Sequence, residues 1–224
     1  MTCSWTYDHY SFCIQKARGH GYALIPFNEI TLYKQDQPLI ILRHDIDYSI
    51  QRALNMARLE KSLGVRATYF IRVHAQTYNI FEYNNYLALK EIISLGHEIG
   101  LHLEAIDFAH ITADDPLDVF QREKKVLETV LKTTIISAAA HNEHIPAGNR
   151  RNSSFFVIFN KKEAGIEYDA YDASFTKEIK YISDSSGRWR EGCMCKHIGK
   201  YPRLQILVHP CWRFKDHLFE SSPA

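Results

Sequence analysis

The sequence lacks three features that would assign it to a membrane or to a nucleic acid. No apolar stretch among its 224 residues approaches the length needed to cross a bilayer. The first residues lack the basic region and following apolar run of a secretory signal peptide. An excess of charge is lacking as well, because the formal net charge is +1. We therefore expect a cytoplasmic protein with no membrane span and no nucleic-acid partner.

A disulfide framework is also lacking. The five cysteines are odd in number and scattered along the chain. Cys193 and Cys195 form a C-x-C pair, which differs from the C-x-x-C of zinc knuckles and redox loops. This usage predicts reduced thiols, as in cytosolic proteins.

Short apolar runs alternate with amphipathic segments along the chain. The run Pro38–Arg43 is typical of a strand buried on both faces, as in a parallel sheet. The segment Ser49–Leu63 has helical periodicity, with serine at its N-cap and Gly64 after its end. The same criteria predict helices over 5–18, 82–95, 116–131 and 153–163, and strands over 66–71, 97–102, 134–140, 165–168, 177–182 and 203–208.

This alternation predicts the fold class α/β, with about six or seven βα units in a barrel or a doubly wound sheet. The chain is long enough for one sizeable core and short for two, so we expect a single domain over residues 1–224. Polar side chains follow the predicted strands in the segment Arg43–Asp47 and at His102, His141 and His209. The carboxyl ends of parallel strands are where α/β folds assemble their sites, so we expect these side chains to converge.

Asp45 and Asp47 are two residues apart, so on an extended strand both would point to one side. Two carboxylates on one face repel each other unless a cation or a proton lies between them, although an Asx-type helix cap is the ordinary role for such a pair. His102 follows a Gly-His-Glu-Ile-Gly stretch, and imidazole with carboxylate suits zinc or another first-row cation. His209 is either a packed residue in a proline-containing turn or a general acid.

These motifs together resemble the polysaccharide deacetylase superfamily, the NodB-homology or carbohydrate esterase family 4 group. Arg43–Asp47 resembles the first motif, usually of the Thr-Phe-Asp-Asp-Gly type, and Gly96–His102 resembles the stretch that leads into the second. Leu207–His209 resembles the last motif, Leu-x-x-His, and Ala67–Phe70 resembles the strand between the first two. The resemblance covers residues 38–212 in the family's order, and it implies an incomplete or distorted (β/α)7-type barrel.

The resemblance also implies roles for individual residues. Asp45 would be the general base, Asp47 and His102 would bind a divalent metal, with zinc as the expected ion, and His209 would protonate the leaving amine. The roles of Asp45 and Asp47 could be exchanged, because His-Asp-x-Asp replaces the family's adjacent aspartates. Asp184, with Asp172 as the alternative, would orient the catalytic histidine.

The second motif of the family is His-x-x-x-His, and here Ile106 occupies the position of its second histidine. We infer that His141, at the end of another predicted strand, replaces this ligand. His144 is the weaker candidate and Glu104 a possible oxygen ligand. The side chains predicted to bind substrate are Arg43, His44, Glu104, Trp189, Arg190 and Trp212.

The expected activity is metal-assisted deacetylation of an N-acetylated sugar, with a small molecule or an oligosaccharide as substrate. Two alternatives remain open at this point. One is a metal-dependent hydrolase of another amide or of a phosphoester, because similar barrel sites serve both chemistries. The other is a non-catalytic carbohydrate-binding protein with a degenerate deacetylase fold, which the substitution at Ile106 keeps open. The sequence does not indicate the oligomeric state.

Overall fold

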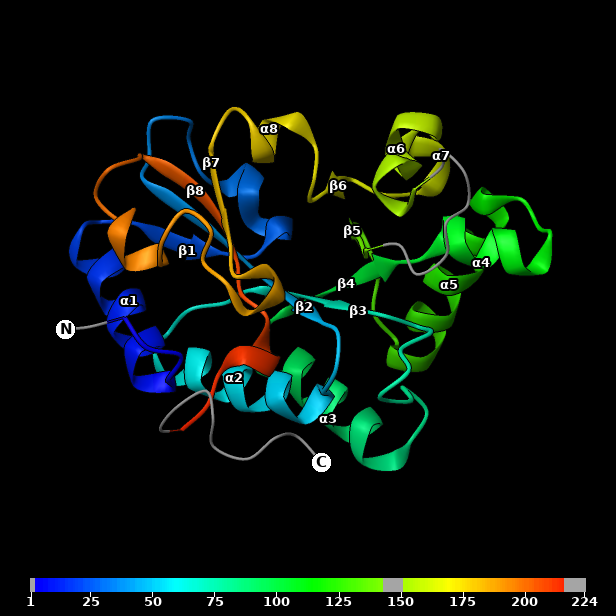
Figure 1. Ribbon diagram of the computed structural model, residues 1–224, viewed down its shortest axis with the longest axis horizontal. Helices are drawn as coiled ribbons and strands as arrows, with labels where there is room; N and C mark the ends of the chain where they lie inside the picture. The colour runs from blue at the N-terminus through cyan, green and yellow to red at the C-terminus, as the bar shows by residue number, and fades with distance from the viewer. Residues whose placement is uncertain (1–2, 143–150, 216–224) are drawn as a thin grey trace.

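A sheet of eight strands forms the centre of the molecule (Figure 1). The computed structural model describes residues 3–142 and 151–215. The strands are β1 (Ala23–Ile25), β2 (Leu39–Ile46), β3 (Thr68–Ile71), β4 (Glu98–Leu103), β5 (Ser137–Ala140), β6 (Tyr168–Asp169), β7 (Lys180–Ser183) and β8 (Arg203–Leu207). Their order is β6-β5-β4-β3-β2-β8-β7, β1 adds to β2, and every pairing is parallel.

The sheet curls into a barrel that stays open between its two edge strands, β6 and β7. Among the described residues, no backbone pairing joins β6 to β7. A side chain from β8 spans part of this opening, because Gln205 Nε2 donates to the carbonyl oxygens of Ala170 (3.0 Å) and Phe175 (2.8 Å). The predicted α/β class and incomplete (β/α)7-type barrel are confirmed.

Helices flank the sheet on its outer side (Figure 1). The described α-helices are α1 (Tyr7–Gly19), α2 (Ile50–Ser62), α3 (Tyr83–Ser94), α4 (Ala105–Thr112), α5 (Pro116–Leu131), α6 (Phe155–Ile158), α7 (Lys161–Ala164) and α8 (Ala173–Thr176). The 3-10 helices are η1 (Phe27–Leu32), η2 (Asn152–Ser154), η3 (Ser185–Gly187), η4 (Met194–Lys196) and η5 (Pro210–Trp212). No described helix combines the length and apolarity that crossing a membrane requires.

The two faces of β2 contact different cores. Its outward residues, among them Ile40 and Leu42, pack against the helices in the larger core. Its inward residues Leu39 and Ile41 belong to a small core inside the barrel, with Phe70 of β3. Space inside is tight at Gly100 of β4, where an added Cβ would lie 2.4 Å from the Phe70 ring. Glycine is therefore required at this point of the predicted Gly-His-Glu-Ile-Gly stretch.

His44 lies on the outer face of β2 and is completely buried. Its Nε2 lies 2.8 Å from Glu60 Oε1 on α2, and its Nδ1 donates to the Val208 carbonyl oxygen at 2.8 Å. The hydroxyl groups of Tyr10 and Tyr69 donate to the same Glu60 carboxylate. The predicted contact of His44 with substrate finds no support in this network, which joins the sheet to its covering helices away from the barrel interior.

The helix predicted over 153–163 is interrupted. Phe159 has an extended backbone (φ −112°, ψ 140°), and Asn160 accepts a hydrogen bond from the Lys162 amide and so begins α7. This side-chain cap competes with continuation of the helix, as asparagine often does. The short elements β1, α4 and α8 were not predicted from the sequence.

Candidate functional site

The carboxyl ends of β2, β4 and β5 bring three predicted metal ligands together. His102 Nε2 lies 3.3 Å from Asp47 Oδ1, and His141 Nε2 lies 3.9 Å from the same oxygen. One ligand atom from each residue lies within 4.8 Å of the others. His209, which follows β8, places its Nε2 3.6 Å from Asp47 Oδ2. The structure thus brings Asp47 and the three histidines together at one end of the barrel.

The donor set fits a divalent cation. Asp47 Oδ1 is buried and has no hydrogen-bond partner among the described residues, although two imidazoles face it. His102 Nδ1 donates to the Ala139 carbonyl oxygen at 2.9 Å, which leaves the lone pair of Nε2 directed at Asp47. Ligands bound to zinc at about 2.0–2.1 Å in a tetrahedron are about 3.3 Å apart. The distance from His102 to Asp47 matches this value, and His141 at 3.9 Å would have to move closer. Three protein ligands would leave one position open, as in catalytic zinc sites.

Glu104 lies behind His141, with Oε1 3.3 Å from His141 Nδ1. Arg72 binds the same carboxylate through two hydrogen bonds of 2.7 and 3.1 Å. Burial alone would raise the pKa of Glu104, but His141 and Arg72 outweigh it and lower the pKa to about 2. Glu104 is 2% exposed, so these contacts suit the orientation of His141 better than the substrate contact predicted from the sequence.

Ile106 occupies the first turn of α4 and is buried in the core between sheet and helices. Asn152 accepts hydrogen bonds from the amides of Ile106 (3.1 Å) and Asp107 (3.3 Å), which fixes the start of α4. The position of the resembled second histidine is thus occupied by a packed apolar side chain. His141 enters from β5 instead, and the weaker candidate His144 lies outside the described residues.

Asp45 lies beside the group formed by Asp47, His102 and His141, which we call the Asp47 centre, but its carboxylate is bound by Arg43. The guanidinium group donates to both carboxylate oxygens at 2.8 Å, and the two side chains are 0% and 2% exposed. Burial alone would raise the pKa of Asp45, but Arg43 and His102 hold it well below its usual range. The predicted contact of Arg43 with substrate finds no support here, because Arg43 is buried and paired with Asp45. Asp45 Oδ2 remains 3.4 Å from His102 Nε2, within the site.

His209 is oriented by Asp184, as the sequence predicted. Asp184 Oδ1 accepts hydrogen bonds from the Nδ1 of His209 (2.7 Å) and from its backbone amide (2.9 Å). Burial alone would lower the pKa of His209, but Asp184, with Asp45 and Asp47, outweighs it and the pKa rises to about 9. The alternative Asp172 instead binds Lys161 at 2.6 Å and caps α8. Without a bound metal, the raised pKa favours the protonated form of His209 at neutral pH, and its Nε2 is directed toward Asp47.

Arg213 completes this arrangement and was not singled out from the sequence. Its guanidinium group lies 2.9 Å from Asp184 Oδ2 and packs over the rings of Trp5 and Trp189. Trp5 and Trp189 stack on each other with ring centres 6.1 Å apart. Trp189 therefore packs against Arg213 and helps to hold it in place. The substrate contact predicted for Trp189 finds no support in this arrangement.

Arg190 and Trp212 lie where a substrate could reach them. Arg190 is exposed and lines a groove of about 330 Å³, together with Asn142, Tyr181, Ser183, Ser185, Ser186, Arg188 and Glu191. Asn142 directly follows His141, so the groove borders the Asp47 centre. Trp212 is half-buried and meets the exposed Tyr48 edge to face, with ring centres 6.4 Å apart.

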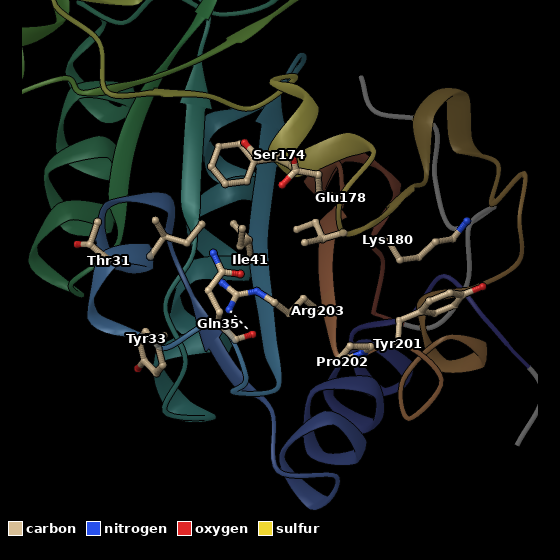
Figure 2. A pocket seen from close by; sticks show the side chains of 13 residues that line it. Thr31, Tyr33, Gln35, Ile41, Ser174, Glu178, Lys180, Tyr201, Pro202 and Arg203 are labelled. Carbon is tan, nitrogen blue, oxygen red and sulfur yellow. Dashed lines mark hydrogen bonds between the residues drawn. The ribbon is translucent and has the colours of Figure 1, made fainter.

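A larger cavity of about 530 Å³ lies near the amino-terminal ends of the strands (Figure 2). Ile41, Lys180 and Arg203 line it, together with residues of η1 and α8, and none of the predicted site residues does. Chemistry in barrels of this type occurs at the carboxyl ends of the strands. We therefore interpret this cavity as the opening of the incomplete barrel at the opposite, amino-terminal ends.

Comparison with known proteins gives a structural likeness alone. No family model matches the sequence, and no curated protein matches it. The structure is similar to that of BA3943, a "CE4 family pseudoenzyme" from Bacillus anthracis, with 14% identity, a TM-score of 0.52, and coverage of 79% of this chain and 56% of that one. It is similar to the polysaccharide deacetylase Bc1974 from Bacillus cereus, with 15% identity, a TM-score of 0.51, and coverage of 78% and 80%. IcaB from Ammonifex degensii has 14% identity, a TM-score of 0.52, and coverage of 92% and 85%.

The chain thus spans just over half the length of the anthracis protein. It has the fold of CE4 polysaccharide deacetylases, and the predicted resemblance is confirmed at that level. Because the fold is shared by a deacetylase and by a pseudoenzyme, it does not decide whether the chain is active.

Proposed function

We propose that this chain is a metal-dependent hydrolase that removes the acetyl group from an N-acetylated sugar. The observation that carries the proposal is the convergence of Asp47, His102 and His141 beside His209, in a fold shared with polysaccharide deacetylases. Zinc is the expected ion, because imidazole and carboxylate suit it. When bound, such an ion polarises a carbonyl group and lowers the pKa of water.

The two aspartates have different surroundings, which supports different roles. Asp47 offers an unpartnered oxygen to two imidazoles and so suits a metal ligand. Asp45 is held in its ionised form by Arg43 and lies 3.4 Å from His102 Nε2, so it can accept the proton of the attacking water.

His209 would supply the proton to the departing amine. Its Nδ1–H is engaged by Asp184, so only Nε2–H faces the site. A histidine that is protonated at neutral pH, as its raised pKa implies, is in the correct form for a general acid.

The groove beside His141 suits a polar substrate that carries an anionic group. Arg188 and Arg190 are exposed along it, and guanidinium groups bind phosphate and carboxylate through paired hydrogen bonds. Tyr48 and Trp212 offer an apolar face near Asp47 for the sugar ring. We therefore favour a nucleotide-linked or lipid-linked N-acetyl sugar, as a precursor of a surface polysaccharide.

The test is acetate release from a panel of N-acetyl sugars, with phosphoesters as a parallel panel and with zinc, cobalt or manganese added. Wild-type protein and the variant His110→Ala, an exposed histidine outside the site, should release acetate, and His102→Ala should not. Phosphate release without acetate release would assign the alternative hydrolase chemistry. No release from either panel by metal-loaded protein would refute the proposal.

A second candidate is a carbohydrate-binding protein without activity. Two observations favour it: Ile106 replaces a ligand of the resembled motif, and a structural neighbour is a pseudoenzyme. Sugar binding by calorimetry, without acetate release from any bound sugar, would support this alternative.

A further inference from the structure

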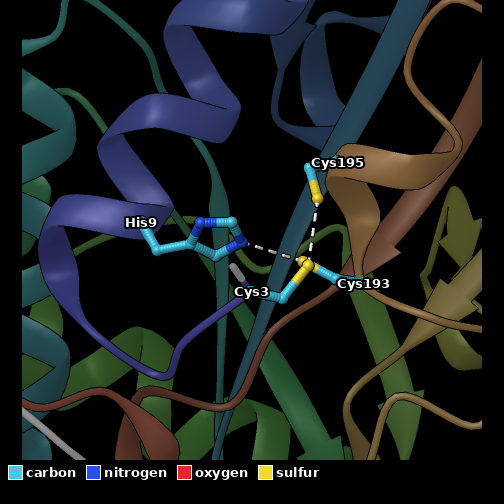
Figure 3. Close-up of side chains that lie close together, drawn as sticks. All are labelled: Cys3, His9, Cys193 and Cys195. Atoms are coloured by element: carbon cyan, nitrogen blue, oxygen red, sulfur yellow. Dashed lines mark hydrogen bonds between the residues drawn. The ribbon is translucent and has the colours of Figure 1, made fainter. Parts of the chain in front are cut away.

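A second group of metal-binding side chains lies far from the Asp47 centre in the sequence. Cys3, His9, Cys193 and Cys195 place one ligand atom each within 4.8 Å of the others (Figure 3). Cys3 Sγ lies 3.5 Å from Cys195 Sγ, and His9 Nε2 lies 3.2 Å from Cys193 Sγ. Three separate parts of the chain therefore meet here: the first residues, α1, and the segment around η4.

We propose that these four residues bind a structural zinc ion. Three cysteines and one histidine form a known type of closed, tetrahedral zinc site. Bonds of about 2.3 Å to sulfur and about 2.0 Å to nitrogen place such ligands roughly 3.5 to 3.8 Å apart, close to the observed spacing. Thiolate ligands also select zinc over magnesium and calcium, which prefer oxygen.

The surroundings suit such an ion. His9 and Cys193 are buried, Cys195 is half-buried, and Cys3 is exposed, so an ion can enter from the surface and end enclosed. One Zn²⁺ with three thiolates carries a net charge of −1, and the three thiol protons are released to solvent. Lys16, whose Nζ donates to the Cys195 carbonyl oxygen at 2.6 Å, lies beside this charge.

The ion would join the first residues of the chain to the segment around η4, near the residues that hold Asp184 in place. Trp5, two residues after Cys3, stacks on Trp189, and Arg213 packs over both rings while it pairs with Asp184. Thr6 also forms an isolated parallel bridge with Phe214. The zinc ion would thus hold the first residues of the chain, and Trp5 with them, close to Trp189 and Arg213.

Cobalt substitution tests the site separately from the Asp47 centre, which contains no cysteine ligand. Protein purified under reducing conditions, freed of metal and then loaded with Co²⁺, should show a sulfur-to-cobalt charge-transfer band in the near ultraviolet. Cys195→Ser and Cys3→Ser should remove most of this band. Cys211→Ser, which changes a cysteine outside the group, should keep it, and so should His102→Ala.

Elemental analysis after zinc loading is the second measurement, and it uses folded wild-type protein even if a variant is unstable. Zinc content should fall by about one ion per chain in Cys195→Ser and stay unchanged in Cys211→Ser. Zinc K-edge absorption of the wild type should show sulfur ligands at about 2.3 Å. Absence of sulfur from that spectrum, or a Cys3–Cys195 disulfide in the purified wild type in place of bound metal, would overturn the proposal.

Discussion

The two clusters of metal-binding side chains differ in their donor atoms and in what surrounds them. The Asp47 centre offers one carboxylate and two imidazoles at the carboxyl ends of strands, beside a protonated histidine and a groove. The group of Cys3, His9, Cys193 and Cys195, which we call the Cys3 cluster, offers three thiols and one imidazole from three separate segments of the chain. Three ligands with an open position favour catalysis, and four ligands that enclose an ion favour stability. The difference supports our proposals of reaction chemistry at one cluster and structural support at the other.

Loss of an Asp47-centre ligand should produce the largest effect on activity. Asp47→Ala should lower kcat/KM for acetate release by at least about a thousandfold, because several kcal/mol of transition-state stabilisation depend on the ion. The melting temperature should change little. Steady-state kinetics and calorimetry measure the two effects. If Asp47→Ala lowered the melting temperature strongly while its folded molecules kept the wild-type kcat/KM, the distinction between the clusters would fail.

The Asp184–His209 pair should control the alkaline limb of the pH profile. Because Asp184 raises the pKa of His209 above the ordinary histidine value, the acid form is kept to higher pH and is lost as the pH rises through the raised pKa, which is about 9 without a metal and lower with a cation bound at Asp47. Asp184→Asn should lower this pKa, move the alkaline limb to lower pH, and reduce kcat/KM by about a hundredfold. His209→Ala should remove the limb. An unchanged limb in Asp184→Asn would mean that another group supplies the proton.

Glu104 should matter through His141 and not through the substrate. Glu104→Gln should weaken metal affinity by about 10-fold to 100-fold, as for other residues that orient a ligand. Added zinc should restore most of the activity while KM for the sugar stays constant. A raised KM at saturating zinc would return Glu104 to the substrate-binding role predicted from the sequence.

The Cys3 cluster should affect stability more than catalysis. Cys195→Ser should lower the melting temperature of the zinc-loaded protein by roughly 5 to 10 °C and change kcat/KM less than tenfold. Cys211→Ser is the matched control for the melting temperature, which should stay as in wild type. A drop in kcat/KM as large as that of Asp47→Ala, without a change in stability, would contradict the structural role.

Sequence reasoning identified the Asp47 centre because its signals are local. Each of its side chains follows a predicted strand, and parallel strands end at one edge, so the convergence of Asp47, His102 and His141 could be anticipated. The Cys3 cluster has no comparable signal, because Cys3 and Cys195 are 192 residues apart and meet only in the folded chain. The C-x-C pair alone predicts reduced thiols, and the cysteines of the structure are free, but the pattern gives no indication of the zinc site that we propose.

Local sequence patterns could have corrected some of the other predictions. Residues two apart on a strand share a face, so Arg43 could have been paired with Asp45 and His44 assigned to the opposite side. Asn160 is a favoured cap residue and could have divided the helix predicted over 153–163. The short helix α4 begins directly after β4, and its start depends on Asn152 from a distant segment, so no local pattern predicted it.

Metal-edge anomalous diffraction from zinc-supplemented crystals tests the central claim most directly. We predict an anomalous peak within bonding distance of Asp47, His102 and His141, about 2.0–2.1 Å from the ligand atoms. Ordered side chains at these three residues without a peak between them, in crystals grown with excess zinc, would contradict the account.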